Sequence, residues 1–113
     1  MIDDDLELCQ ELDEILKDEG YLVESVADGS LGKTALISNP YDLVIIDYRM
    51  PSFNGVEVLK FIKEKGLKIK VFLISGRPFV EKLLKEEGLS SLVTSVLNKP
   101  FCIKTLLDNI KRL

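Results

Sequence analysis

The feature that most constrains the fold is an uninterrupted apolar run, Leu43-Val44-Ile45-Ile46, which ends directly at Asp47. A run of this kind is typical of a strand buried on both faces, as in a parallel sheet. Open α/β sheets bind ligands at the carboxyl ends of such strands. Asp47 therefore lies where a site would form, although an acid followed shortly by Pro51 is also what a simple turn uses.

Three other strand-like segments also end in polar residues. They are Met1-Ile2 before Asp3-Asp4-Asp5, Val71–Ile74 before Ser75-Gly76, and Val93–Leu97 before Asn98-Lys99-Pro100. Carboxylates, a hydroxyl and an amine are thus expected at the ends of different strands. Taken singly, each has a plain structural explanation: a solvated helix start for the acids, a turn for Ser75 and an exposed cation for Lys99. Asp5 fits the helix start best, so we leave it out of the site.

Helical and strand patterns alternate along the chain. Helices are expected over residues 8–16, 31–38, 58–66, 79–87 and 103–113, and strands over residues 21–26, 43–46, 70–74 and 93–97. Short connections between such units imply right-handed crossovers and a parallel sheet covered on both faces. If Met1-Ile2 ends a further strand, the sequence predicts an α/β fold with a doubly wound five-stranded parallel sheet, strand order 2-1-3-4-5, flanked by five helices.

Composition narrows the possible functions. The 113 residues suit a single domain over residues 1–113, and no linker suggests an output domain. No apolar stretch reaches the ~20 residues of a membrane helix, and the acidic start is no secretory signal, so we expect a cytoplasmic protein with no membrane contact. A net charge of −4 argues against direct nucleic-acid binding.

The histidine and cysteine content limits the kinds of catalytic and metal site that the chain can form. The chain has no histidine, which argues against histidine-dependent triads and common zinc hydrolase sites. Its two cysteines, Cys9 and Cys102, fall in helical patterns, and we expect both to be reduced core thiols.

In combination, the strand ends resemble the receiver domain of two-component response regulators. The matching residues are Asp3-Asp4, Asp47 with Met50-Pro51 and Gly55, Ser75-Gly76, and Lys99-Pro100-Phe101. The resemblance covers essentially the whole chain. It implies that Asp47 accepts a phosphoryl group from a histidine kinase or a histidine phosphotransfer protein.

The resemblance also implies a Mg²⁺ site, with Mn²⁺ as a possible substitute. Asp4 would bind the metal directly, Asp3 through water, and Asp47 and the backbone carbonyl of Arg49 would complete the protein ligands. Clustered carboxylates repel one another, and a hard cation relieves that repulsion. By the same resemblance, Lys99 would contact one phosphoryl oxygen and Ser75 would donate a hydrogen bond to another.

The chain departs from this family in two places. Only Met1 and Ile2 precede the acids, so the first strand is truncated. Either the chain starts upstream, or the fold tolerates a two-residue strand, or another chain fills the gap, for example in a homodimer. The second departure is Val96, three residues before Lys99, where many receivers carry a ring that moves on phosphorylation. Valine is small and stiff at χ1, so a switch would depend on Ser75 alone.

Two competing functions remain open at this point. A degenerate receiver could act as a protein-interaction module without phosphotransfer, as the short strand and Val96 suggest. A haloacid-dehalogenase-like phosphatase also uses an acid, a hydroxyl and a lysine at strand ends, but it needs a second acid where this chain has Arg49. We therefore expect no enzyme acting on a separate substrate, only a protein that catalyses its own phosphorylation and dephosphorylation.

Overall fold

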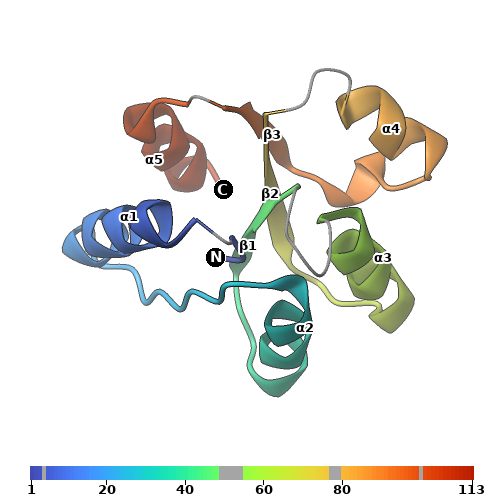
Figure 1. The fold of residues 1–113 in the computed structure, drawn as a ribbon, viewed down its shortest axis with the longest axis horizontal. Coiled ribbons are helices and arrows are strands. Elements are labelled where there is room, and N and C mark those ends of the chain that lie inside the picture. The colour runs from blue at the N-terminus through green and yellow to red at the C-terminus, as the bar shows by residue number, and fades with distance from the viewer. Residues whose placement is uncertain (4, 49–54, 77–79, 100) are drawn as a thin grey trace.

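A central parallel sheet separates two layers of helices (Figure 1). The computed structural model describes residues 1–3, 5–48, 55–76, 80–99 and 101–113. The helices are α1 (Leu6–Asp18), α2 (Gly29–Ser38), α3 (Gly55–Lys65), α4 (Val80–Glu86) and α5 (Ile103–Lys111), with a short 3₁₀ helix, η1 (Ser90–Leu92). Helices α1 and α5 lie on one side of the sheet, and α2, α3 and α4 lie on the other. Within the described residues, no helix is long and apolar enough to cross a membrane.

Three strands form the continuous part of the sheet. They are β1 (Leu43–Asp47), β2 (Lys70–Ser75) and β3 (Ser95–Asn98), paired in parallel in the order β1-β2-β3. On the free side of β1, Ile2 forms parallel bridges both to Ile46 and to Val26. These bridges extend the order to 2-1-3-4-5, which confirms the predicted doubly wound arrangement.

Met1 and Ile2 occupy the position of the first strand in the sheet. Ile2 donates its backbone N–H to the carbonyl of Ile45 at 2.7 Å and accepts from Asp47 at 2.9 Å. On the opposite side, Val26 donates to the Met1 carbonyl at 2.9 Å and accepts from Asp3 at 3.1 Å. The Ile2 side chain is buried against α2 at Gly32, where an added Cβ would lie 2.9 Å from Ile2 Cγ1. Residues 1–3 are therefore anchored on both sides.

The strand predicted over residues 21–26 is wrong in extent. Only Val26 forms a bridge, and the residues before it carry no strand pairing. A strand needs a partner along its length, and the bonds from residues 1–3 reach only Val26 and Glu24 of this segment. Similarly, β3 begins two residues later than predicted, since Val93 forms the C-terminal cap of η1.

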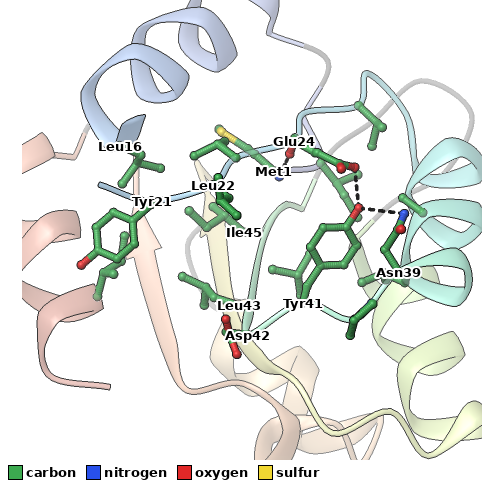
Figure 2. A pocket seen from close by; sticks show the side chains of 18 of the residues that line it. Met1, Leu16, Tyr21, Leu22, Glu24, Asn39, Tyr41, Asp42, Leu43 and Ile45 are labelled. Atoms are coloured by element: carbon green, nitrogen blue, oxygen red, sulfur yellow. Dashed lines mark hydrogen bonds between the residues drawn. The ribbon is translucent and has the colours of Figure 1, made fainter. Parts of the chain in front are cut away.

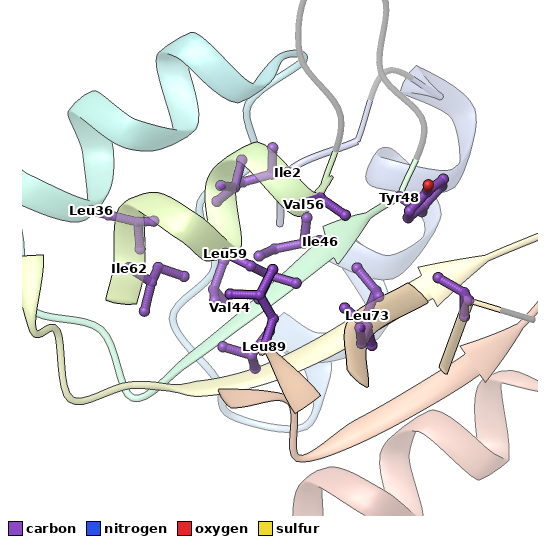
Figure 3. Packing of buried hydrophobic residues seen from close by; sticks show 14 residues of the cluster. Ile2, Leu36, Val44, Ile46, Tyr48, Val56, Leu59, Ile62, Leu73 and Leu89 are labelled. Atoms are coloured by element: carbon purple, nitrogen blue, oxygen red, sulfur yellow. The ribbon is translucent and has the colours of Figure 1, made fainter. Parts of the chain in front are cut away.

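Side-chain alternation along the strands divides the core into two clusters. One lies between the sheet and α2, α3 and α4, and includes Ile46, Leu59 and Leu73 (Figure 3). The other lies between the sheet and α1 and α5, and includes Phe72, Ile74 and Leu106. A β-branched run buried on both faces is what the sequence predicted for β1, and Val44, Ile45 and Ile46 are all at most 4% exposed.

Local signals in the sequence explain most helix ends. Asp5 and Asp28 cap α1 and α2, and each side chain accepts a hydrogen bond from the backbone N–H three residues later. Gly20 and Gly88 follow α1 and α4 with φ of 93° and 70°, a conformation that favours glycine at helix ends. The interpretation of Asp5 as a helix-start residue is thus confirmed.

The two cysteines differ in environment. Within the described residues neither cysteine forms a disulfide, as expected, and Cys9 is buried on α1. The expectation that Cys102 is also a core thiol is wrong, because its side chain is exposed. Cys102 occupies the cap position before α5 with an extended backbone, so it leaves the helical row that buries Leu106 and Ile110.

Candidate functional site

The polar strand ends predicted from the sequence meet at one edge of the sheet. Asp47 is the last residue of β1, Ser75 is the last residue of β2, and Lys99 directly follows β3. The register aligns Asp47 with Ile74 and Ser75 with Asn98, which places these ends side by side. Lys99 is held to this edge by its own backbone N–H, which donates to the Ser75 carbonyl at 2.8 Å.

Asp3 joins this group from the truncated first strand. Its neighbour Ile2 accepts the backbone hydrogen bond from Asp47, so the two acids lie on adjacent strands. The Asp3 side chain is 0% exposed, and Oδ1 accepts a hydrogen bond from the backbone N–H of Asp5 at 2.9 Å. Its other oxygen, Oδ2, is buried with no hydrogen-bond partner among the described residues. An unmatched buried carboxylate oxygen is costly, so this atom marks a position where a cation would be stabilised.

Lys99 is the positive charge that faces both acids. Its Nζ lies 3.4 Å from Asp47 Oδ1 and 3.9 Å from Asp3 Oδ2. The Lys99 side chain is 33% exposed, whereas Asp47 is 7% exposed, so the ammonium reaches in from the surface. Among the described residues, one ammonium faces two carboxylates, so this group of three side chains is short of one positive charge when both acids are ionised.

The pKa of Asp3 reflects this deficit of positive charge. Burial raises the pKa of Asp3 to about 7, and the nearby Asp47 carboxylate acts in the same direction. The hydrogen bond from Asp5 N–H and the charge of Lys99 oppose that rise without cancelling it. Near neutral pH the Asp3 carboxyl is therefore protonated part of the time.

Two residues position the site without taking part in the predicted chemistry. Gly55 donates its N–H to the Tyr48 carbonyl at 2.7 Å, and an added Cβ would lie 2.9 Å from the Asp47 carbonyl oxygen. The sequence analysis named Gly55 only as a motif residue, and the structure shows that α3 begins in close contact with the end of β1. Sequence analysis also missed the Asp5 backbone contact with Asp3. The acid two residues earlier, which commonly forms an Asx turn, was the available signal.

Part of the predicted site lies outside the described residues. Asp4 and Arg49 are in this group, together with the motif residues Met50, Pro51 and Pro100. In the part of the chain that is described, no three His, Cys, Asp or Glu side chains cluster to hold a metal. Asp3 and Asp47 are the two carboxylates that the described residues bring together. Two carboxylates, one with an unmatched oxygen, fit Mg²⁺, which binds through one or two carboxylates and keeps several waters.

A family comparison agrees with this arrangement. Residues 1–111 match the response regulator receiver domain. The chain belongs to that family.

Curated relatives of this receiver are longer proteins. It is 33% identical to the transcriptional regulatory protein QseB of Escherichia coli O157:H7 over 82 residues, 73% of this chain and 37% of the relative. It is 36% identical to the CpxR homolog of Haemophilus influenzae over 77 residues, 68% of this chain and 33% of the relative. The matched region thus spans about a third of these relatives.

Solved receiver structures match almost the whole chain. The receiver domain of the Francisella response regulator 1452 is 28% identical, with a TM-score of 0.87 over 98% of this chain and 90% of that one. The Thermotoga maritima response regulator TrrA, solved in complex with Mg(2+)-BeF, is 27% identical, with a TM-score of 0.82 over 98% of this chain and 93% of that one. Vibrio cholerae CheY4 is 31% identical, with a TM-score of 0.83 over 98% of this chain and 92% of that one. The flavodoxin-like receiver fold is thereby shown.

The proposed switch positions of the receiver occupy different environments. Ser75 is 1% exposed at the end of β2, close to the acids. Val96 lies on β3 and packs, partly buried, against the cluster of α2, α3 and α4. Its side chain therefore belongs to the core layer, and no ring at this position is available to move.

Proposed function

We propose that this chain is a phosphoacceptor receiver that takes a phosphoryl group onto Asp47 from a histidine kinase or a histidine phosphotransfer protein. The observation that carries the proposal is the charge arrangement at one sheet edge. Lys99 Nζ lies 3.4 Å from Asp47 Oδ1, beside a buried Asp3 oxygen that lacks a hydrogen-bond partner within the described chain. Phosphoryl transfer requires a nucleophilic carboxylate and nearby positive charge. Here Asp47 would be the nucleophile, the Lys99 ammonium supplies one positive charge, and the buried Asp3 oxygen would favour binding of a second cation.

The transfer is a substitution at phosphorus. An oxygen of Asp47 forms a new P–O bond while the P–N bond of the donor phosphohistidine breaks, and the electron pair of that bond leaves on the imidazole nitrogen. The product is an acyl phosphate on Asp47. Lys99 then pairs with a phosphoryl oxygen, since its ammonium already lies within ion-pair distance of the accepting side chain. Ser75, buried at the adjacent strand end, would donate a hydrogen bond to another oxygen.

The metal ligands follow from the same arrangement. Asp47 would hold Mg²⁺ or Mn²⁺ together with Asp4 and the Arg49 carbonyl, and Asp3 would bind the metal through water, as the resemblance implies. When bound, the metal would neutralise charge on the carboxylates and on the phosphoryl oxygens. Asp3 supports this assignment because its unmatched oxygen faces the same space as Asp47 and Lys99.

We also propose that the domain catalyses its own phosphorylation from a small donor and its own dephosphorylation. With acetyl phosphate, the bond that breaks is the one between phosphorus and the acetate oxygen, and acetate leaves. In dephosphorylation, water attacks phosphorus and Asp47 leaves as the free carboxylate.

Intact-mass measurement with acetyl phosphate and Mg²⁺ tests the proposal. We expect a gain of one phosphoryl group in the wild type and in Asp42→Asn, an exposed acid outside the site, and no gain in Asp47→Asn. Chelation of Mg²⁺ should abolish the gain. A wild type that stays unmodified while it remains folded would favour the competing function, a degenerate receiver that acts only through protein contacts.

A further inference from the structure

The buried thiol of Cys9 reaches the candidate site from α1, and the chemistry proposed above does not use it. The thiol donates a hydrogen bond to the backbone carbonyl of Asp3, with 3.5 Å between Sγ and the carbonyl oxygen. Cys9 is 5% exposed and Asp3 is 0% exposed, so water has little access to this bond. The thiol therefore contacts the residue whose carboxylate lies beside Asp47 and Lys99.

The start of α1 places the Cys9 side chain at this position. The backbone N–H of Cys9 donates to the carbonyl of Asp5, the cap residue of the helix, at 3.0 Å. Cys9, Leu12 and Leu16 form the buried row of α1, and the two leucines pack in the apolar cluster beneath α1 and α5. At the end of this row a thiol replaces the aliphatic side chain. A thiol is small and apolar enough for the row, yet it carries a hydrogen-bond donor, which leucine lacks.

Hydrogen bonds from neighbouring segments hold Asp3 in place. Its backbone N–H donates to the Val26 carbonyl at 3.1 Å, and its carboxylate Oδ1 accepts from the backbone N–H of Asp5 at 2.9 Å. The Lys99 ammonium fixes Asp3 less firmly, because Nζ lies 3.9 Å from Oδ2, beyond hydrogen-bond distance. The Cys9 thiol holds the carbonyl, so the carboxyl-terminal side of Asp3 is tied to α1.

We infer that Cys9 is a positioning residue of the metal site: its thiol fixes the Asp3 backbone so that the carboxylate oxygen Oδ2 faces Asp47 and Lys99. The inference rests on the proposed function, because metal binding is what this placement serves. Removing the thiol leaves a buried carbonyl without this donor, and such a group gains free energy by turning toward another donor or toward water. A turn of the Asp3 backbone carries its carboxylate with it and so weakens the binding of a cation beside Asp47.

Calorimetric titration with Mg²⁺ of Cys9→Ala and Cys9→Ser tests the inference. Alanine removes the donor, whereas serine keeps a donor on a side chain of similar size. We expect Cys9→Ala to bind Mg²⁺ about 3- to 10-fold more weakly than the wild type, the effect of one hydrogen bond, and Cys9→Ser to stay within about twofold of the wild type. Cys102→Ala removes the exposed thiol and should bind Mg²⁺ like the wild type.

A second comparison separates positioning from a general loss of stability. Leu16→Ala shortens a side chain two turns along the same buried row, and we expect it to destabilise the fold at least as much as Cys9→Ala without changing the Mg²⁺ affinity of the folded protein. Cys9→Val, which fills the volume of the thiol without a donor, should behave like Cys9→Ala and replaces it if the alanine variant does not fold.

Phosphorylation by acetyl phosphate gives an independent readout. The Cys9→Ala variant should need more Mg²⁺ than the wild type for its half-maximal rate, yet approach the wild-type rate at saturating Mg²⁺, because Asp47 and Lys99 are unchanged. A purely structural role would not separate these two quantities.

Three results would overturn the inference while the wild type binds Mg²⁺ and is phosphorylated. One is a Cys9→Ala variant with the Mg²⁺ affinity of the wild type. Another is a Cys9→Ser variant that binds as weakly as Cys9→Ala, since packing and not the donor would then matter. The third is a Leu16→Ala variant that weakens Mg²⁺ binding equally. A folded wild type that neither binds Mg²⁺ nor becomes phosphorylated would instead contradict the proposed function, and the positioning role with it.

Discussion

The two ends of the short segment Met1–Asp3 lie in chemically different surroundings. At its carboxyl end, Asp3 is fully buried and packed beside Asp47 and Lys99, and one carboxylate oxygen has no hydrogen-bond partner among the described residues. At its amino end, Met1 borders a mainly apolar groove lined by residues such as Leu16 and Ile45, and its amine donates a hydrogen bond to the Glu24 carbonyl at 2.7 Å (Figure 2). Among the described residues, the first end is polar and short of positive charge, whereas the second end is apolar.

The contrast shows that the two ends are stabilised by different interactions. A buried anionic oxygen is stabilised by a cation, whereas apolar side chains are stabilised by removal from water. Ile2 links the two ends, because it bonds to Asp47 and packs on Gly32. The hydrogen bonds and the packing of Ile2 therefore hold Asp3 beside Asp47.

The largest expected effect is the loss of folding stability when a core side chain of β1 is shortened, and we expect this loss to differ between the two ends of the strand. Ile46 is 0% exposed in the cluster nearest the site, whereas Leu43 is only partly buried beside the groove. We expect Ile46→Ala to lower the free energy of unfolding by ~2–5 kcal/mol and Leu43→Ala to lower it by about 1 kcal/mol. Urea denaturation measures both. Equal losses would show that the groove end is packed as tightly as the site end.

The next largest expected effect is the pH dependence of folding stability that Asp3 causes. Its folded-state pKa is raised from 3.8 to about 7, so the stability that the protonated form provides is complete below about pH 4 and is lost as pH rises through about 7. Asp3→Asn cannot ionise, and we expect it to be more stable than the metal-free wild type at pH 8 by about 1–3 kcal/mol, with the gap closing toward pH 5.

Thermal denaturation across this pH range measures the gap. The chain contains no histidine, so no imidazole titrates in the same window. A stability gap that stays constant from pH 5 to pH 8 would contradict the raised pKa of Asp3.

The smallest effect tests how Ile2 is anchored. An added Cβ at Gly32 would overlap the Ile2 side chain, so we expect Gly32→Ala to cost about 1–2 kcal/mol despite the better helix propensity of alanine. Combined with Ile2→Val, which shortens the opposing side chain, the two changes should cost less than the sum of the single changes. A double-mutant cycle measures the coupling, and strictly additive losses would show that this contact does not hold the segment.

Much of the fold and of the site could be predicted because the signals are local. The apolar run before Asp47 defines β1, and the carboxyl ends of parallel strands must meet, which brings Ser75 and Lys99 to the same edge. What could not be predicted depends on partners distant in the chain. The segment of residues 21–26 looks like a strand but forms a bridge only at Val26, to Ile2. The raised pKa of Asp3 depends on burial that no local pattern reports.

The central claim is that Asp3 and Asp47 form a cation-dependent site, and calorimetric titration with Mg²⁺ tests it most directly. The account predicts one Mg²⁺ bound per chain by the wild type and by Asp42→Asn, and binding weakened at least tenfold, about 1.4 kcal/mol, in Asp3→Asn and in Asp47→Asn. Equal Mg²⁺ affinity in all four proteins would contradict it.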